Sequence, residues 1–174
     1  MIKHKINKVE KDLVLLGAGH ANISVITYIG KIKPKGIRIT LITDSLYSTY
    51  SGMIPGYIQG EYSWQEINID VYRLANKFNI RIINASVTNI IHAQKKVFLN
   101  KRPPVSYDIL SINLGITSKK NNIFGAEKNS YALKPISKIK QTIDKTMHYF
   151  ANADKKENLV IIGGGAAGVE ISLA

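Results

Sequence analysis

The chain has 174 residues, no cysteine and a formal net charge of +12 at pH 7. Without cysteine it can form neither disulfide bridges nor thiolate metal sites, and thiol catalysis is excluded. The charge comes mainly from lysines spread along the chain, which indicates a general composition bias and predicts no nucleic-acid partner.

We expect a cytoplasmic protein without a transmembrane segment, because no apolar run reaches the about 20 residues that a membrane-spanning helix needs. Residues 1–11 are expected to be a polar, frayed lead-in. They resemble a signal peptide only superficially, because Glu10, Lys11 and Asp12 interrupt the apolar stretch.

A dinucleotide-binding βαβ unit is predicted near the start of the chain. Leu13–Leu16 is typical of a buried strand, and it runs through a glycine turn into a helix over residues 21–31. Gly17 would let the chain turn sharply, and Gly19 would let a pyrophosphate approach the backbone. The helix would direct N–H groups at the phosphates. The match to G-x-G-x-x-G is incomplete, because Asn22 stands at the third glycine.

A second strand is predicted over Ile37–Thr43, and it is followed by Asp44. An acid after the second strand of such a unit normally binds ribose hydroxyls. The alternative is that Asp44 caps the next turn through its side-chain oxygen. The sequence gives the two interpretations equal weight.

The segment from Tyr47 to Tyr57 fits neither the helical nor the strand period. Such irregular segments inside compact domains are often functional. A flat aromatic ligand would suit Gly52, Pro55 and Gly56, where the backbone can be approached closely. The alternative is a surface turn with packed tyrosines.

The middle of the chain predicts alternating helices and strands. We expect a helix over 70–78, a strand over 80–83 and a hairpin or meander formed by 86–93 and 97–99. A break at Pro103-Pro104 should follow, and then a buried strand over 107–115, a lysine-rich connector over 117–130 and a helix over 136–150. The helix over 136–150 has an apolar stripe at spacings of three and four residues, which is typical of a core-facing surface.

A second dinucleotide-binding unit is predicted at the other end of the chain. Leu159–Ile162 is typical of a strand, and Gly163, Gly165 and Gly168 complete the G-x-G-x-x-G pattern before a helix. Two such units in one chain predict two dinucleotides, and therefore electron transfer between them.

Four motifs resemble the pyridine nucleotide–disulfide oxidoreductase superfamily, and type II NADH dehydrogenases show them in the same order. These motifs are Gly17–Ala21, Ser51–Pro55, Tyr107–Gly115 and Gly163–Glu170. A closer likeness is to the flavoprotein found beside, or fused to, selenide, water dikinase. It rests on Gly17–Ala21, Thr49–Gly56 and Arg102–Asp108.

The resemblance implies an α/β fold: a Rossmann-like FAD-binding domain with a parallel sheet and a β-meander, and the start of an inserted NAD(P)H-binding Rossmann unit that is truncated. The FAD-binding domain would cover residues 1–118. Residues 119–174 would be a connector and the incomplete NAD(P)H-binding domain.

The resemblance also implies the cofactor-binding residues. Gly17, Ala18, Gly19 and Ala21 would hold the FAD pyrophosphate. The implied residues beyond this turn are His20, Asp44, Ser51, Pro55, Val87, Gly115, Gly163, Gly165, Gly168 and Glu170. Val87 would meet the adenine through its backbone, and residues 51–55 would lie against the flavin. Gly115 would let the chain pass close to the FAD, while Gly163, Gly165 and Gly168 would hold NAD(P)H. Two of these assignments have alternatives: His20 either donates to phosphate or orients the turn, and Thr43, rather than Asp44, falls where relatives have the acid.

The implied activity is hydride transfer from NAD(P)H to FAD and onward to an unidentified acceptor such as a quinone. No catalytic residue or metal ligand is expected, because this transfer needs positioning and electrostatics only. The resemblance also implies a functional link to selenide, water dikinase and peripheral contact with the inner face of the membrane. The alternative is a truncated, non-catalytic dinucleotide-binding fragment.

Overall fold

The computed structural model describes residues 8–116 and 123–174, and its contacts divide the chain into two units. Unit 1 comprises residues 1–48 and 70–115, and unit 2 comprises residues 49–69 and 116–174. The chain leaves unit 1 through β3 (Tyr47–Thr49) and returns to it through β4 (Asn68–Asp70). The predicted domain boundary between residues 118 and 119 lies outside the described residues and stays a prediction.

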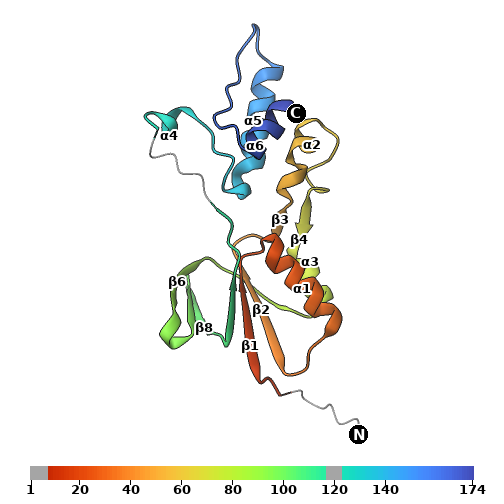
Figure 1. The fold of residues 1–174 in the computed structure, drawn as a ribbon, viewed down its shortest axis with the longest axis vertical. Coiled ribbons are helices and arrows are strands. Elements are labelled where there is room, and N and C mark those ends of the chain that lie inside the picture. The colour runs from red at the N-terminus through yellow and green to blue at the C-terminus, as the bar shows by residue number, and fades with distance from the viewer. Residues whose placement is uncertain (1–7, 117–122) are drawn as a thin grey trace. The chain divides into compact units, whose positions relative to one another are not determined.

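Unit 1 is built on a four-stranded parallel sheet, as the sequence predicts (Figure 1). Its strands, in spatial order, are β5 (Arg81–Asn84), β2 (Ile37–Thr43), β1 (Lys11–Leu16) and β9 (Ile109–Ile112). Helix α1 (His20–Ile32) connects β1 to β2, and α3 (Val71–Lys77) precedes β5. Near-continuous apolar runs form β1 and β2 because a parallel strand is buried on both faces. Since all four strands are parallel, their carboxyl ends meet at one edge of the sheet.

The predicted β-meander is present and has one strand more than the sequence predicts. β6 (Val87–Ile91), β7 (Lys96–Leu99) and β8 (Arg102–Ser106) form an antiparallel sheet in that order, with the short helix η2 (His92–Gln94) between β6 and β7. The predicted break at Pro103-Pro104 is wrong, because both prolines lie within β8. Proline is tolerated there because β8 is an edge strand, where a missing N–H removes no hydrogen bond from a second neighbour.

The strand predicted over residues 107–115 is shorter and more exposed than expected. β9 ends at Ile112, and the side chains of Ile109 and Ile112 are 59% and 56% exposed. The reason is that β9 pairs with β1 alone and forms an edge of the sheet. An edge strand has one neighbour instead of two, so its side chains are less covered.

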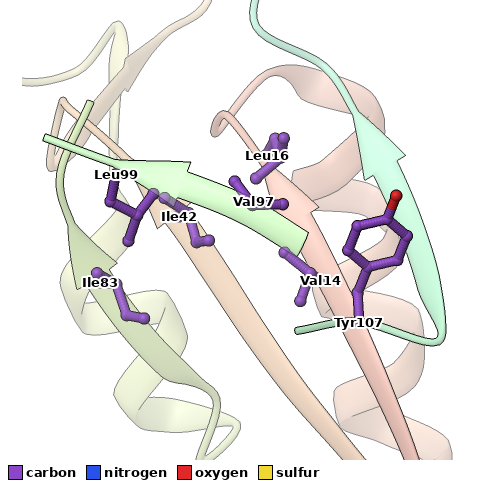
Figure 2. Close-up of a cluster of buried hydrophobic side chains, with 7 residues drawn as sticks. All are labelled: Val14, Leu16, Ile42, Ile83, Val97, Leu99 and Tyr107. Carbon is purple, nitrogen blue, oxygen red and sulfur yellow. The ribbon is translucent and has the colours of Figure 1, made fainter. Parts of the chain in front are cut away.

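The core of unit 1 lies between the parallel sheet and the meander (Figure 2). The sheet contributes Val14, Leu16, Ile42 and Ile83 to this cluster. β7 crosses over these strands in Figure 2 and contributes Val97 and Leu99. Tyr107, which precedes β9, completes the cluster. Leu15 and Leu41 alternate with these residues along β1 and β2, so they point to the opposite face, where they are equally buried.

Gly30 lets helix α1 pack closely against the end of helix α3. A Cβ atom on Gly30, within α1, would lie 2.2 Å from the ring of Phe78, the residue that ends α3. Gly30 is buried and in a helix, where glycine is about 1 kcal/mol less favourable than alanine. Its role is therefore to make room for Phe78.

Unit 2 is mainly helical. It contains η1 (Ser51–Met53), α2 (Ile54–Ile58), α4 (Ala126–Asn129), η3 (Ile136–Lys138), α5 (Ile139–Ala151) and α6 (Ala166–Leu173). The predicted helix over 136–150 is confirmed as η3 and α5, and its Ile139 and Ile143 are buried with Ile54 and Ile67. The segment over 47–57, expected to be irregular, forms β3, η1 and α2.

The strand predicted over Leu159–Ile162 is wrong. These residues have no regular secondary structure, and Leu159, Val160 and Ile162 are 60%, 76% and 70% exposed. A strand exists only where a neighbour accepts and donates its backbone hydrogen bonds, and none of the described strands pairs with this segment. The helix predicted after it is confirmed as α6.

None of the helices in the described part of the chain is both long and apolar enough to cross a membrane.

Replacing Ile42 by alanine should lower the free energy of unfolding by about 2–5 kcal/mol, because the side chain is fully buried and its loss leaves a cavity. Urea denaturation followed by circular dichroism measures this change. Ile109→Ala is the matched control in the same sheet: its side chain is 59% exposed, so it should cost less than about 1 kcal/mol. Equal losses in the two variants would contradict the core assigned here.

Candidate functional site

The turn after β1 has a backbone that only glycine fits. Gly17 has a φ of +79°, and its N–H donates to the carbonyl oxygen of Ile42 at 2.8 Å. A Cβ atom on Gly17 would lie 2.4 Å from the carbonyl oxygen of Asn113, and one on Gly19 would lie 2.0 Å from Asn113 Oδ1. Both glycines are therefore required by close packing against the chain that follows β9.

Asn22, which departs from the glycine fingerprint, is a structural residue of this turn. Its side chain is fully buried, and its Nδ2 donates to the carbonyl oxygens of Leu16 at 2.9 Å and Gly17 at 2.7 Å. Its Oδ1 accepts a hydrogen bond from Ser111 Oγ at 2.7 Å. Where the fingerprint has a glycine for close packing, this chain has three hydrogen bonds that join β1, the turn and β9.

Backbone N–H groups at the start of α1 donate hydrogen bonds to a residue outside the helix. Gly19 is the N-cap residue and offers no side chain, and no acidic residue lies in the first turn. Asn113 Oδ1 accepts a hydrogen bond from the backbone N–H of Ala21 at 3.2 Å, and the Asn113 carbonyl oxygen accepts from the Gly19 N–H at 3.3 Å. A helix start of this kind, with N–H groups and the positive end of the helix dipole, suits an anion.

The sheet gathers the predicted residues of unit 1 at one edge. Gly17 follows β1, Asp44 follows β2 and Gly115 lies shortly after β9, so all three lie at the carboxyl ends of parallel strands. Val87 opens β6 three residues after β5 ends. Ligands of open α/β sheets bind at this edge. Ala18, His20 and Ala21 complete the turn, with His20 as the first residue of α1.

The turn after β2 is held by Thr43 and not by Asp44. Thr43 Oγ1 donates to the carbonyl oxygen of Ser45 at 2.9 Å and accepts from the Ser45 N–H at 3.2 Å. Asp44 is exposed at the end of the strand. The alternative interpretation of Asp44 as the cap of this turn is therefore not supported.

The predicted residues of unit 2 lie in two places. Ser51, Pro55 and Glu170 line one hollow of ≈ 40 Å³ together with Leu133, Lys134, Ile136 and Ala167, among others. This volume holds a few water molecules. The later glycines form a turn before α6: Gly163 has a φ of +112°, Gly165 is the N-cap residue, and a Cβ atom on Gly168 would lie 2.0 Å from the Gly163 carbonyl oxygen.

A charged cluster fastens α2, which carries Pro55, to α5. Tyr57 donates to Asp144 Oδ1 at 2.5 Å, and Lys140 Nζ donates to the other oxygen of the same carboxylate. Lys140 Nζ also lies 6.0 Å from the ring centre of Tyr57 and 5.9 Å from that of Trp64, at cation–π range. This cluster holds the proline-bearing segment on the long helix of unit 2.

The cluster shifts the pKa of its members. Burial, followed by the hydrogen bond to Asp144, raises the pKa of the Tyr57 phenol. Burial alone would raise the pKa of the Asp144 carboxyl, but the hydrogen bonds from Lys140 and Tyr57 outweigh it and lower that pKa. Asp144 is therefore a carboxylate at neutral pH. Among residues 8–116 and 123–174, no three histidine or acidic side chains are grouped to hold a metal ion.

The chain is similar to known proteins in sequence and in fold. The sequence profile of the pyridine nucleotide-disulphide oxidoreductase family matches residues 11–174. The NADH dehydrogenase-like protein YutJ of Bacillus subtilis (strain 168) is 29% identical over 163 residues, and the type II NADH:quinone oxidoreductase of Staphylococcus haemolyticus (strain JCSC1435) is 28% identical over 168 residues. The X-ray structure of sulfide:quinone oxidoreductase from Aquifex aeolicus superposes with a TM-score of 0.69 at 26% identity.

The shared region is a part of each relative. The matches cover 93% and 92% of this chain but 44% and 42% of the Bacillus and Staphylococcus proteins. The Aquifex structure matches 82% of this chain and 33% of its own. The chain thus spans less than half the length of these relatives.

Replacing Asn22 by aspartate should lower the free energy of unfolding by at least about 2 kcal/mol. The carboxylate has the same shape, but it cannot donate to the carbonyl oxygens of Leu16 and Gly17 and would be buried. Urea denaturation followed by circular dichroism measures the change. Asn100→Asp, at an exposed turn of the same unit, is the control and should change stability by less than about 0.5 kcal/mol. A similar small effect at Asn22 would contradict the role given to it.

The cluster of Lys140, Asp144 and Tyr57 predicts that the fluorescence emission of Trp64 changes at acid pH. Because the pKa of Asp144 is lowered on folding, its contribution to stability is present above the unfolded value of about 3.9 and is lost as the pH falls through the folded pKa. The contribution should be under about 1 kcal/mol, since the carboxylate is 44% exposed. The emission of Trp64, the only tryptophan, reports the change.

In the Asp144→Asn variant, the acid-side change in Trp64 emission should disappear. The matched control is Asp154→Asn, a change of the same kind at an exposed residue of unit 2, which should titrate like the unmodified chain. An unaltered titration in Asp144→Asn would show that this carboxylate does not control the environment of Trp64.

Proposed function

The chain belongs to the pyridine nucleotide-disulphide oxidoreductase family, and from this premise we propose that it supplies the FAD-binding turn and the NAD(P)H-binding turn of a flavin-dependent oxidoreductase. The family consists of enzymes that use FAD and NAD(P)H. The observation that carries the proposal is the glycine turn between β1 and α1, placed at the carboxyl edge of a parallel sheet.

The residues of unit 1 fit the pyrophosphate of FAD. Gly17 and Gly19 bear no side chain over the turn, and the first turn of α1 has no acidic residue that would repel phosphate. Gly17, Ala18, Gly19 and Ala21 would hold the two phosphates. Gly115, whose missing Cβ would have no atom of the described residues within 4 Å, would let the chain pass close to the cofactor.

The remaining assignments follow the same reasoning. Val87 would meet the adenine through its backbone, and Asp44 would bind the ribose. His20, at the start of α1, would either donate to phosphate or orient the turn. In unit 2, Ser51 and Pro55 would lie against the flavin. The binding of NAD(P)H would fall to Gly163, Gly165, Gly168 and Glu170.

The chemistry belongs to the cofactors: NAD(P)H supplies a hydride, and FAD accepts it and passes electrons on. The chain's own residues would bind and orient the two nucleotides, and no side chain needs to act as an acid or base. A quinone is the acceptor that we favour, because both the Staphylococcus and the Aquifex relatives carry quinone in their names. Such an acceptor would bring the protein to a membrane surface. The link to selenide, water dikinase rests on motif likeness alone and stays a prediction.

A second candidate is a dinucleotide-binding chain without turnover of its own. The observation that favours it is the second glycine turn, which lacks the strand that normally precedes it. Oxidation of NADH with a short-chain quinone, followed at 340 nm, separates the two candidates. Turnover at rates of about 1 s⁻¹ or more supports the oxidoreductase, and FAD binding without turnover supports the second candidate.

Replacing Ala21 by aspartate should weaken FAD binding by about tenfold or more. The carboxylate would lie in the first turn of α1, where the helix dipole tolerates it, so the fold should be kept while the pyrophosphate is repelled. Titration of FAD followed by quenching of its fluorescence measures the affinity.

Two variants control this experiment. Ala21→Ser, a small neutral change, should bind FAD within about twofold of the unmodified chain. Ala167→Asp, at the corresponding position of α6, should weaken NAD(P)H binding more than it weakens FAD binding. If Ala21→Asp binds FAD as tightly as the unmodified chain, the pyrophosphate does not bind at α1.

A further inference from the structure

The side chain of Asn113 lies where the proposed function places a phosphate. Its Oδ1 accepts a hydrogen bond from the Ala21 N–H at 3.2 Å. The same oxygen lies 2.0 Å from the position of a Cβ atom on Gly19, which is the space that a glycine leaves open for an approaching ligand. The backbone group and the open space assigned to the pyrophosphate are therefore both taken by a group of the protein.

We propose that the Asn113 carboxamide is an internal competitor for the pyrophosphate of FAD, an inference that rests on the proposed function. In the FAD-free chain its oxygen satisfies the Ala21 N–H. When FAD binds, a phosphate oxygen takes over this N–H and the Asn113 side chain turns away. Asn113 thus sets the affinity of the site by stabilising its empty form.

The backbone of Asn113 would stay in place during this exchange. Its N–H donates to the carbonyl oxygen of Leu16 at 2.8 Å, and its own carbonyl oxygen accepts from the Gly19 N–H. Both bonds join β9 to the glycine turn without the side chain. The residue is half-buried, so the carboxamide can reach water when it rotates. Displacement therefore needs a side-chain rotation only.

The chemistry of the competitor decides the direction of the effect. A carboxamide oxygen is a neutral acceptor, and a phosphate oxygen is a charged one, which makes a stronger hydrogen bond at a helix start. Replacement of the Asn113 oxygen by a phosphate oxygen is therefore favourable. The hydrogen bond that Asn113 makes in the FAD-free chain is lost, however, and this loss lowers the affinity for FAD. A net hydrogen bond of this kind corresponds to a factor of about two to ten in affinity.

The test compares FAD affinity in the 174-residue chain and in two variants, by quenching of flavin fluorescence. Asn113→Ala, which removes the competitor, should bind FAD about two- to tenfold more tightly. Asn113→Asp, which places a carboxylate on the same N–H, should bind FAD at least about tenfold more weakly. Asn100→Ala, at an exposed turn of the same unit, should bind like the unmodified chain.

A second readout does not involve FAD. Without cofactor, the Ala21 amide should exchange its hydrogen at least about threefold faster in Asn113→Ala than in the unmodified chain, because its acceptor is gone. Circular dichroism confirms that each variant is folded, and Asn113→Asp carries the comparison if Asn113→Ala is not.

The outcomes distinguish the inference from the proposed function. If neither the unmodified chain nor Asn113→Ala binds FAD, the proposed function is wrong and the inference falls with it. If the unmodified chain binds FAD and Asn113→Ala binds it equally or more weakly, the function stands and the competitor is rejected. Unchanged exchange of the Ala21 amide also rejects it.

Discussion

The carbonyl oxygen of Leu16 is the point on which the glycine turn depends. It lies at the end of β1 and accepts two hydrogen bonds, from the backbone N–H of Asn113 and from the side chain of Asn22. One bond attaches the end of β9 to the turn, and the other attaches the start of α1. Without both, neither the position of Gly19 nor the direction of α1 would be defined.

Much of unit 1 could be predicted from its apolar pattern. Continuous apolar runs predicted β1 and β2, and glycine at positions 17 and 19 predicted the turn, because few other sequences satisfy these steric demands. The likeness to a known family supplied the order of motifs, and the family match agrees with it. The parallel sheet and the meander are the parts of the prediction that the structure confirms.

The failures have a common physical cause, which is that a residue's neighbours in space were not visible in the sequence. Pro103 and Pro104 predict a break because an edge position in a sheet cannot be recognised locally. Leu159–Ile162 predicts a strand because its apolar pattern does not reveal whether a partner strand exists. The roles of Asn22 and Asn113 could not be predicted, although their amides are the chemical signal, because their partners Ser111 and Ala21 lie 89 and 92 residues away in the chain.

Gly30 is a position of this chain that helix propensity alone would wrongly mark for replacement. Judged locally, alanine there would improve α1, since glycine is the poorer helix former. Judged in space, the same methyl group would collide with the ring of Phe78. A redesign guided by helix propensity alone would therefore force α1 and α3 apart, and would weaken the fold at a residue outside the proposed cofactor sites.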